Sequence, residues 1–239
     1  MTAAVPDAGR RRREEVATGL DRVRARISAA CAGAARDAAD VTLVVVTKTY
    51  PASDVALLAE LGVRDVGENR DQEAAAKHAA VADLGLRWHF IGQLQSNKAR
   101  SVAGYADLVH SVDRPSLVTA LDRAAAGHDR VLDCLLQVSL DGDPARGGVP
   151  VADLPGLAER AAAAENLRLR GVMAVAPLGA DPLRAFAPLR ELLATVREHA
   201  PQADLISAGM SGDLEAGVTS GATHLRVGSA ILGSRPPRQ

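Results

Sequence analysis

Short apolar runs alternate with helical segments along most of this 239-residue chain. The clearest run, Val41–Thr47, is apolar on both faces, as a buried strand of a parallel sheet should be. Repeated β–α units of this kind predict a parallel sheet covered by helices. The pattern predicts eight strands, at Val41–Thr47, Arg64–Gly67, Trp88–Gly92, Leu108–Ser111, Val131–Ser139, Leu169–Val175, Leu205–Ser207 and Thr223–Val227.

Eight strands in a chain of this length favour an α/β fold with a single (β/α)8 barrel of the TIM type, which takes about 250 residues. An open doubly wound sheet is the alternative, because strand order cannot be read from one sequence. Apolar residues at helical spacing also predict an extra N-terminal helix over residues 14–38. Further helices are expected at Ser53–Leu61, Asp71–Ala82, Pro115–Ala126, Val151–Ala164 and Pro182–His199.

The ends of the chain and its charge set further expectations. We expect residues 1–13 to be a disordered leader, with Arg10–Arg13 as a solvated tail, and residues 14–239 to form one domain. Lysine plus arginine total 28 and aspartate plus glutamate 29, which gives no electrostatic case for binding nucleic acid or an acidic membrane. No secretory signal or apolar run of about 20 residues is present, so we expect a cytoplasmic protein. No long apolar seam is evident, so we expect a monomer.

Cysteines and histidines give no metal site. Two cysteines cannot form a disulfide framework, and Cys134 lies in an apolar run, so we expect it in the core. The six histidines show no close pairing suited to zinc. His89 is interpreted as a hydrogen-bonded core histidine rather than a catalytic base.

Lysine is scarce: 25 of the 28 basic residues are arginine, and the three lysines are Lys48, Lys77 and Lys98. A lysine amine can lose its proton and form a Schiff base, whereas a guanidinium cannot under ordinary conditions. Lys48 directly follows the first predicted strand, which places it at the barrel end where reactive groups collect. The alternative is a lysine that extends from a strand end to water.

Two glycine-containing segments follow the last two predicted strands, Ser207–Gly212 and Arg226–Ser229. Glycines let backbone N–H groups approach an anion closely, and phosphate sites after strands seven and eight recur in barrels. Ser211, Gly228 and Ser229 are the expected donors, with the carboxylate of Asp213 pointing outward. The alternative is ordinary turn glycines with capping serines. Asn69, after the second strand, either hydrogen-bonds a ligand or caps the next helix.

Taken in order, these segments resemble the pyridoxal phosphate homeostasis proteins, single-domain barrels similar to the N-terminal domain of alanine racemase. Any one motif is weak, but the ordered set is specific and covers the chain from about Val41 to Gly233. The segments that carry the resemblance are Val46-Thr47-Lys48-Thr49, Gly67-Glu68-Asn69, Trp88-His89-Phe90-Ile91-Gly92, Leu94-Gln95-Ser96-Asn97-Lys98, His110-Ser111-Val112-Asp113, Gly209-Met210-Ser211 and Arg226-Val227-Gly228-Ser229.

The resemblance implies a site for pyridoxal 5′-phosphate (PLP). It implies that Lys48 forms a Schiff base with the cofactor aldehyde, that Asn69 lies beside the ring, and that Arg226 faces the pyridine nitrogen. It implies that the phosphate is surrounded by Met210, Ser211, Gly228 and Ser229.

The chain departs from the family in three places. Thr47 and Ala208 stand where a serine and a methionine are frequent. Arg146 stands near a position where a further lysine is frequent, which removes any second amine that could accept the cofactor there.

The expected function is non-catalytic: a carrier that holds PLP, limits its free concentration and passes it to apo-enzymes that need it. A cation beside the pyridine nitrogen disfavours its protonation and makes the ring a poor electron sink. Alanine racemase is similar at this position, but its tyrosine base comes from a second domain, and this sequence ends at Gln239. No residue is therefore assigned as catalytic, although Tyr50 lies close enough in sequence to approach the site. The alternatives are a single-domain racemase-like PLP enzyme and a sugar-phosphate enzyme that uses Lys48 on its substrate.

Overall fold

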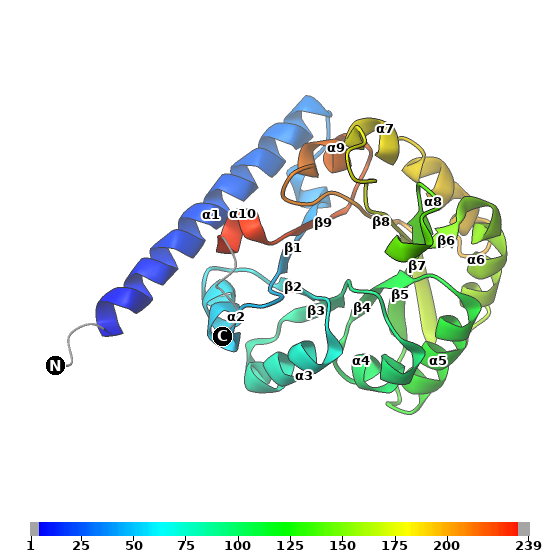
Figure 1. Cartoon of the computed structure of the whole chain (residues 1–239), viewed down its shortest axis with the longest axis horizontal. Coiled ribbons are helices and arrows are strands. Elements are labelled where there is room, and N and C mark those ends of the chain that lie inside the picture. The colour runs from blue at the N-terminus through cyan, green and yellow to red at the C-terminus, as the bar shows by residue number, and fades with distance from the viewer. Residues whose placement is uncertain (1–4, 234–239) are drawn as a thin grey trace.

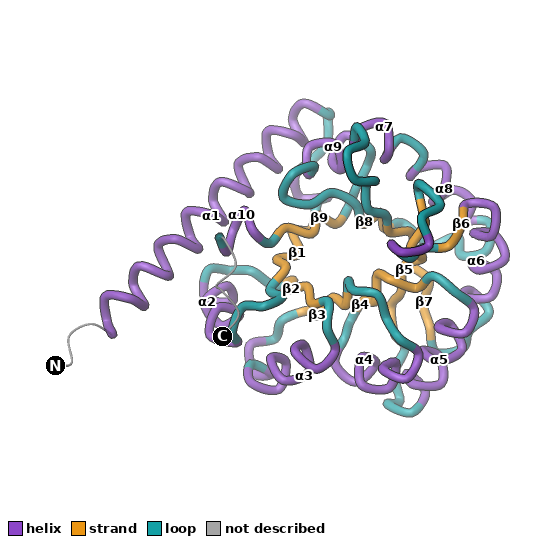
Figure 2. Tube along the Cα trace, viewed as in Figure 1, coloured by secondary structure: helices purple, strands orange, loops and turns teal. Residues whose placement is uncertain are grey.

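Strand pairing decides between the closed barrel and the open sheet. In the computed structural model, which describes residues 5–233, the strands pair in parallel in chain order, β4 pairs β5, and the last strand pairs with the first. The strands are therefore arranged as a ring, visible in Figure 2, and the barrel prediction is confirmed. Its members are β1 (Thr42–Val46), β2 (Asp65–Glu68), β3 (Arg87–Phe90), β4 (Leu108–Val112), β5 (Leu132–Ser139), β7 (Leu167–Met173), β8 (Leu205–Ser207) and β9 (His224–Val227). A two-residue strand, β6 (Val149–Pro150), pairs with β5 alone.

The helices cover the outside of the ring, as Figure 1 shows. Most helices lie where the apolar spacing predicted them, but α4 (Ala99–Tyr105) was not predicted. The single helix expected over residues 182–199 is divided into two helices, and the second begins at Leu189. Pro188 sits at that break, where its missing N–H and ring do not fit a helix interior. The helices are α1 (Val5–Gly33), α2 (Ala52–Glu60), α3 (Asp71–Ala80), α4 (Ala99–Tyr105), α5 (Pro115–Ala126), α6 (Leu154–Ala162), α7 (Pro182–Phe186), α8 (Leu189–Arg197), α9 (Leu214–Thr219) and α10 (Ser229–Leu232).

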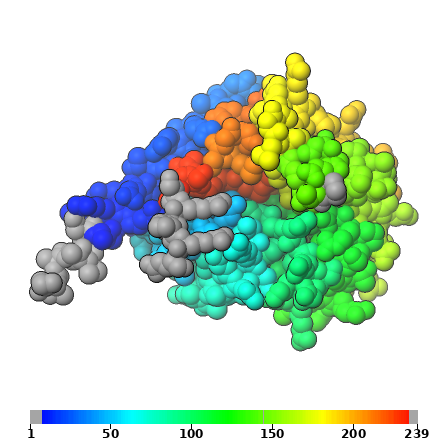
Figure 3. Space-filling view, in the orientation of Figure 1, coloured from blue at the N-terminus to red at the C-terminus, as the bar shows by residue number. Residues whose placement is uncertain are grey.

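The leader expected over residues 1–13 was wrong for residues 5–13, which form the first turns of α1. Figure 3 shows this end of the helix projecting past the barrel. The prediction treated Arg10–Arg13 as a solvated tail, but Arg12 donates to both oxygens of Asp54 on α2, at 3.2 and 2.6 Å. It also donates to the Leu232 carbonyl at 3.1 Å. These contacts, between residues far apart in the sequence, anchor the start of the helix. Residues 1–4 of the leader lie outside the described residues.

Helix α1 packs directly on α10 across the outside of the barrel (Figure 1). The contact depends on Gly19, because a Cβ placed there would lie 2.5 Å from the Ile231 carbonyl oxygen. A side chain at this position would separate the two helices. Because α10 follows directly from the last strand, α1 supports the loop that ends in Ser229.

The core has two parts. The larger lies between the barrel and its helices, and contains the fully buried Cys134, as expected; burial raises the pKa of its thiol to about 12. The smaller is built from Leu108, Leu135 and Met173. No helix in the described part of the chain is both long and apolar enough to cross a membrane.

Candidate functional site

A cavity of about 250 Å³ opens at the carboxyl ends of β1, β8 and β9. Six of the seven residues predicted for the site line it, which brings together positions up to 181 apart in the sequence. Asn69 is the exception. The lining residues are Val46, Lys48, Tyr50, Ile91, Met210, Ser211, Gly212, Arg226, Gly228 and Ser229.

Asn69 lines a separate cavity of about 510 Å³, together with Gln72, Gln93, Lys98 and Arg114. Its backbone is pressed against Gly92, where a Cβ would lie 2.2 Å from the Asn69 carbonyl oxygen. The side chain does not cap the next helix, since α3 begins after Arg70 without a side-chain cap bond. The position of Asn69 beside a bound ring therefore stays a prediction.

Two serine hydroxyls meet at one side of the smaller cavity. Ser211 Oγ lies 3.3 Å from Ser229 Oγ and accepts a hydrogen bond from the Ala230 N–H at 3.4 Å. Gly228 lies beside them, and a Cβ there would lie 3.0 Å from the Val46 carbonyl oxygen. The absence of a side chain at Gly228 thus keeps the β9 loop close to β1. Hydroxyl and amide donors at such a bend are suited to an anion.

The prediction that Asp213 points outward was wrong. Its Oδ1 accepts the Met210 N–H at 2.5 Å, so the carboxylate is turned back into the loop. This bond closes the four-residue turn from Met210 to Asp213, with Ser211 and Gly212 between them. The aspartate is a structural part of the loop, a role typical of aspartate in turns.

Lys48 follows a strand end that is fixed by a buried ion pair. Lys77 Nζ on α3 donates to Glu68 Oε1 at 2.7 Å and to the Thr47 carbonyl at 2.8 Å. Thr47 Oγ1 donates to the same Glu68 oxygen at 2.6 Å. Burial raises the pKa of Glu68. The scarcity of lysine singled out Lys77, but nothing in its sequence surroundings showed that it supports Lys48.

Arg226 is a buried cation at the floor of the cavity. Its Nη1 donates to Ser207 Oγ at 2.5 Å and its Nη2 to the Ala174 carbonyl at 2.9 Å. Burial lowers the pKa of its guanidinium to about 10, so it is charged at neutral pH.

Three histidines that are distant in the sequence come together inside the barrel. The rings of His89, His110 and His224 lie with centroids 5.2 to 6.2 Å apart. His89 is buried and hydrogen-bonded on both ring nitrogens, as expected, to His110 and Asp65, each at 2.9 Å. The sequence showed no histidine pairing suited to zinc, and it could not show this cluster either, because spacing along the chain cannot reveal contacts across a barrel. Among residues 5–233, no group of three or more potential ligands is placed to hold a metal ion.

The buried histidines should make the fold acid-sensitive. Burial lowers the pKa of His224 to about 4, so between that value and about 6.5 the unfolded chain binds more protons. The stability present above pH 6.5 is thus lost as the pH falls toward 4, by about 3 kcal/mol for this residue. Urea unfolding at pH 7 and pH 4 should show a smaller acid loss in His224→Asn than in the wild type. The exposed His128→Gln is the control, and an equal loss in all three proteins would contradict the assignment.

Tyr50 lines the cavity, as its sequence position suggested, but its hydroxyl donates to the Gly233 carbonyl at 2.8 Å. Tyr105 is buried near Asp71, and burial raises its pKa. Tyr50 is therefore the tyrosine at this cavity, and the hydroxyl that a base would need to present is turned toward the C-terminal segment.

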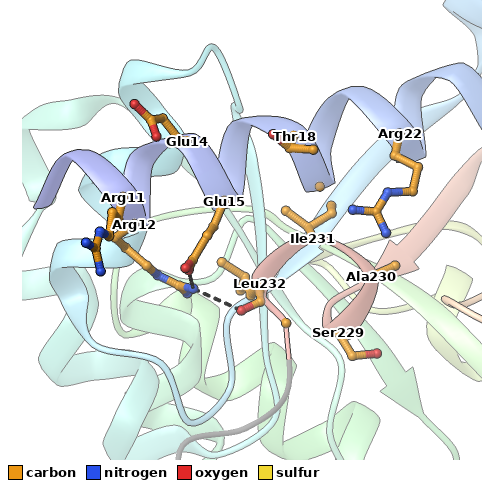
Figure 4. Close-up of a pocket in the computed structure, with 12 residues that line it drawn as sticks. Arg11, Arg12, Glu14, Glu15, Thr18, Arg22, Ser229, Ala230, Ile231 and Leu232 are labelled. Carbon is orange, nitrogen blue, oxygen red and sulfur yellow. Dashed lines mark hydrogen bonds and ion pairs between the residues drawn. The ribbon is translucent and has the colours of Figure 1, made fainter. Parts of the chain in front are cut away.

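A groove of about 680 Å³ runs between α1 and α10 beside the cavity and shares Ser229 with it. Figure 4 shows Arg12 between Glu15 and the Leu232 carbonyl, with Arg22 pointing toward α10. Its α1 wall carries both arginines (Arg11, Arg12 and Arg22) and glutamates (Glu14 and Glu15), so the groove has no strong preference for one sign of charge.

Sequence comparisons identify relatives along nearly the whole chain. The family model described as "Alanine racemase, N-terminal domain" matches residues 19–236. The pyridoxal phosphate homeostasis protein of Mycobacterium tuberculosis is 45% identical over an alignment 253 residues long. The alignment covers 98% of this chain and 96% of that protein.

Solved structures show the same fold. PipY of Synechococcus elongatus, solved with PLP bound, is 36% identical with a TM-score of 0.81, covering 91% of this chain and all of PipY. Alanine racemase from Corynebacterium glutamicum superposes with a TM-score of 0.69 at 16% identity, covering 92% of this chain and 60% of that enzyme. At that identity the second likeness concerns the barrel alone.

Proposed function

The chain belongs to the pyridoxal phosphate homeostasis protein family, and on that premise we propose that it holds PLP on Lys48 as a Schiff base and buffers or delivers it. The observation that carries the proposal is one cavity that contains the amine-bearing side chain of Lys48 and the Ser211–Ser229 hydroxyl pair. An aldehyde that carries a phosphate needs both groups in one site.

The residues present fit such a cofactor. Ser211, Ser229 and the side-chain-free bend at Gly228 offer donors and space for a phosphate. When bound, PLP supplies an aldehyde carbon that condenses reversibly with a primary amine and releases water. Lys48 is the lysine that lines this cavity, while Lys77 is occupied by Glu68 and the Thr47 carbonyl.

The electrostatics of the cavity favour storage over catalysis. Arg226 has only hydrogen-bond donors, so a pyridine nitrogen beside it must accept a hydrogen bond and cannot itself carry a proton. An unprotonated ring withdraws electrons weakly, which slows carbanion chemistry on a bound amino acid. Tyr50, the tyrosine that lines this cavity, donates its hydroxyl to the Gly233 carbonyl and is not presented as a base. The curated relatives are likewise named for homeostasis.

Release to other proteins follows from the same chemistry. The Schiff base is exchangeable with another amine, and Ser229 at the phosphate side is exposed, so the cofactor can leave without a large opening of the barrel. We propose apo forms of PLP-dependent enzymes as the recipients.

Borohydride reduction followed by peptide mass mapping tests the cofactor site. We expect one reduced adduct on Lys48 and none on Lys77 or Lys98, because Lys77 is held by Glu68 and the Thr47 carbonyl and Lys98 lines a different cavity. An adduct on another lysine, or no adduct at all, would contradict the proposed site.

A second experiment separates a carrier from an enzyme. The loaded protein is incubated with a panel of amino acids, and in parallel with an apo-enzyme whose activity reports cofactor transfer. A carrier reactivates the apo-enzyme and leaves the amino acids unchanged. Rapid racemisation or decarboxylation of any amino acid would overturn the carrier role.

A further inference from the structure

A continuous hydrogen-bond chain runs through the inside of the barrel from the cavity floor. Arg226 Nη1 contacts Ser207 Oγ at 2.5 Å, and Ser207 Oγ contacts His110 Nδ1 at 2.8 Å. His110 Nε2 then meets His89 Nδ1 at 2.9 Å, and His89 Nε2 meets Asp65 Oδ1 at 2.9 Å. Every member is buried. The chain ends beside Arg87, whose exposed guanidinium pairs with Asp65 at 2.8 Å.

The chain crosses the barrel rather than following one strand. Ser207 lies on β8 and His110 on β4, and these strands are not neighbours in the ring, so their contact spans the interior. Barrel interiors are usually filled by branched apolar residues, and buried polar groups are costly unless each is hydrogen-bonded. Here each member has its partners, so the network is fully satisfied.

The two ends give the chain a direction. Asp65 as a carboxylate can only accept, and hydrogen bonds from His89 and Arg87 outweigh burial and keep its pKa low. His89 Nε2 therefore carries a proton, and its Nδ1 accepts when the ring is neutral. Burial lowers the pKa of His110 well below its usual value, so that ring is neutral.

At the other end, Arg226 can only donate. Ser207 Oγ accepts from it and must place its single proton on His110 Nδ1, which leaves the His110 Nε2 proton for His89. One arrangement thus satisfies every donor and acceptor, running from Arg226 through Ser207, His110 and His89 to Asp65.

The chain connects Arg226 to a carboxylate that it does not contact. Among the residues that the structure describes, no carboxylate forms a salt bridge with Arg226, although the charge of Asp213 acts on it and opposes the lowering of its pKa by burial. Its guanidinium is held by one hydroxyl and one carbonyl. The negative charge of Asp65 reaches it only through the polarised chain. Such chains strengthen hydrogen bonds cooperatively in a buried setting.

We propose that Ser207, His110, His89 and Asp65 are positioning residues that fix the guanidinium of Arg226 from inside the barrel. The consequence for PLP rests on the proposed function: a fixed donor at the cavity floor sets the orientation of the ring. The direction of the chain itself does not depend on any cofactor.

Nitrogen-15 NMR of histidine side chains in the cofactor-free protein tests the direction at neutral pH. From the hydrogen-bond directions we expect His89 and His110 each to carry a proton on Nε2 and none on Nδ1. A proton on Nδ1 of either ring, or a cationic ring, would overturn the chain. If PLP did not bind at all, the proposed function would be wrong, but the histidine proton positions measured in the cofactor-free protein would not be affected.

A matched pair of serine variants tests the effect on Arg226. Ser207→Ala removes the hydroxyl that links Arg226 to His110, whereas Ser111→Ala removes an equally buried hydroxyl that has no partner. We expect Ser207→Ala to speed hydrogen exchange of the Arg226 side chain, and dissociation of the cofactor, by about tenfold each. Ser111→Ala should stay within about twofold of the wild type. Equal behaviour of the two variants, both folded by circular dichroism, would refute the positioning role.

Discussion

Lys48→Ala is expected to abolish covalent loading with PLP and to weaken total cofactor binding by about a hundredfold, or about 2.7 kcal/mol. The substitution removes the amine that lines the cavity and leaves the Ser211–Ser229 side intact. Residual binding should therefore persist through the phosphate. Absorbance titration measures the imine band, and equilibrium dialysis measures total binding.

Two control variants show whether the loss of PLP loading is due to the missing amine of Lys48. Lys48→Arg keeps a cation of similar length but cannot form a Schiff base, so it should lose the imine band and retain part of the phosphate affinity. Lys98→Ala, at a partly exposed lysine 3.9 Å from Asp71, should load like the wild type. An undiminished imine band in Lys48→Ala would end the assignment of this lysine.

Lys77→Met is expected to destabilise the fold by about 3–5 kcal/mol, because it leaves Glu68 buried without its cation. Glu68 Oε2 already lacks a hydrogen-bond partner, so without the lysine the carboxylate would keep one donor, the Thr47 hydroxyl on Oε1. The Thr47 carbonyl loses its lysine donor at the same time, which should loosen the strand end before Lys48. Urea unfolding gives the stability, and the rate of imine formation reports the position of Lys48.

The same substitution elsewhere provides the control. Lys98→Met breaks a longer, partly exposed contact and should cost less than about 1 kcal/mol. In the double variant Lys77→Met/Glu68→Gln, the neutral amide can still accept from Thr47, and part of the lost stability should return. If Lys77→Met costs no more than Lys98→Met, the buried pair does not support the fold.

The sequence determined the barrel because its signals are local. Most of the ring strands lie in short, largely apolar runs between helical segments, although β2 (Asp65–Glu68) and β9 (His224–Val227) also contain charged residues. This alternation can be recognised in the sequence without tertiary contacts. The site residues that follow strand ends were predictable for a related reason: parallel strands end at the same face, so Lys48, Ser211 and Ser229 had to meet there. The start of α1 was missed because its first turns depend on Arg12 contacting Asp54 and the Leu232 carbonyl.

What surrounds the site was decided only by tertiary structure. The Lys77–Glu68 pair, the inward turn of Asp213 and the chain from Arg226 to Asp65 depend on which side chains face each other across elements. Ser207 and His110 lie 97 residues apart and on strands that do not pair, so no spacing rule connects them. Burial then sets the charge states, since the same histidine in an exposed loop would titrate near its ordinary pKa. The sequence thus specifies which strand ends carry the reactive side chains, and the closed barrel specifies which buried side chains fix their positions.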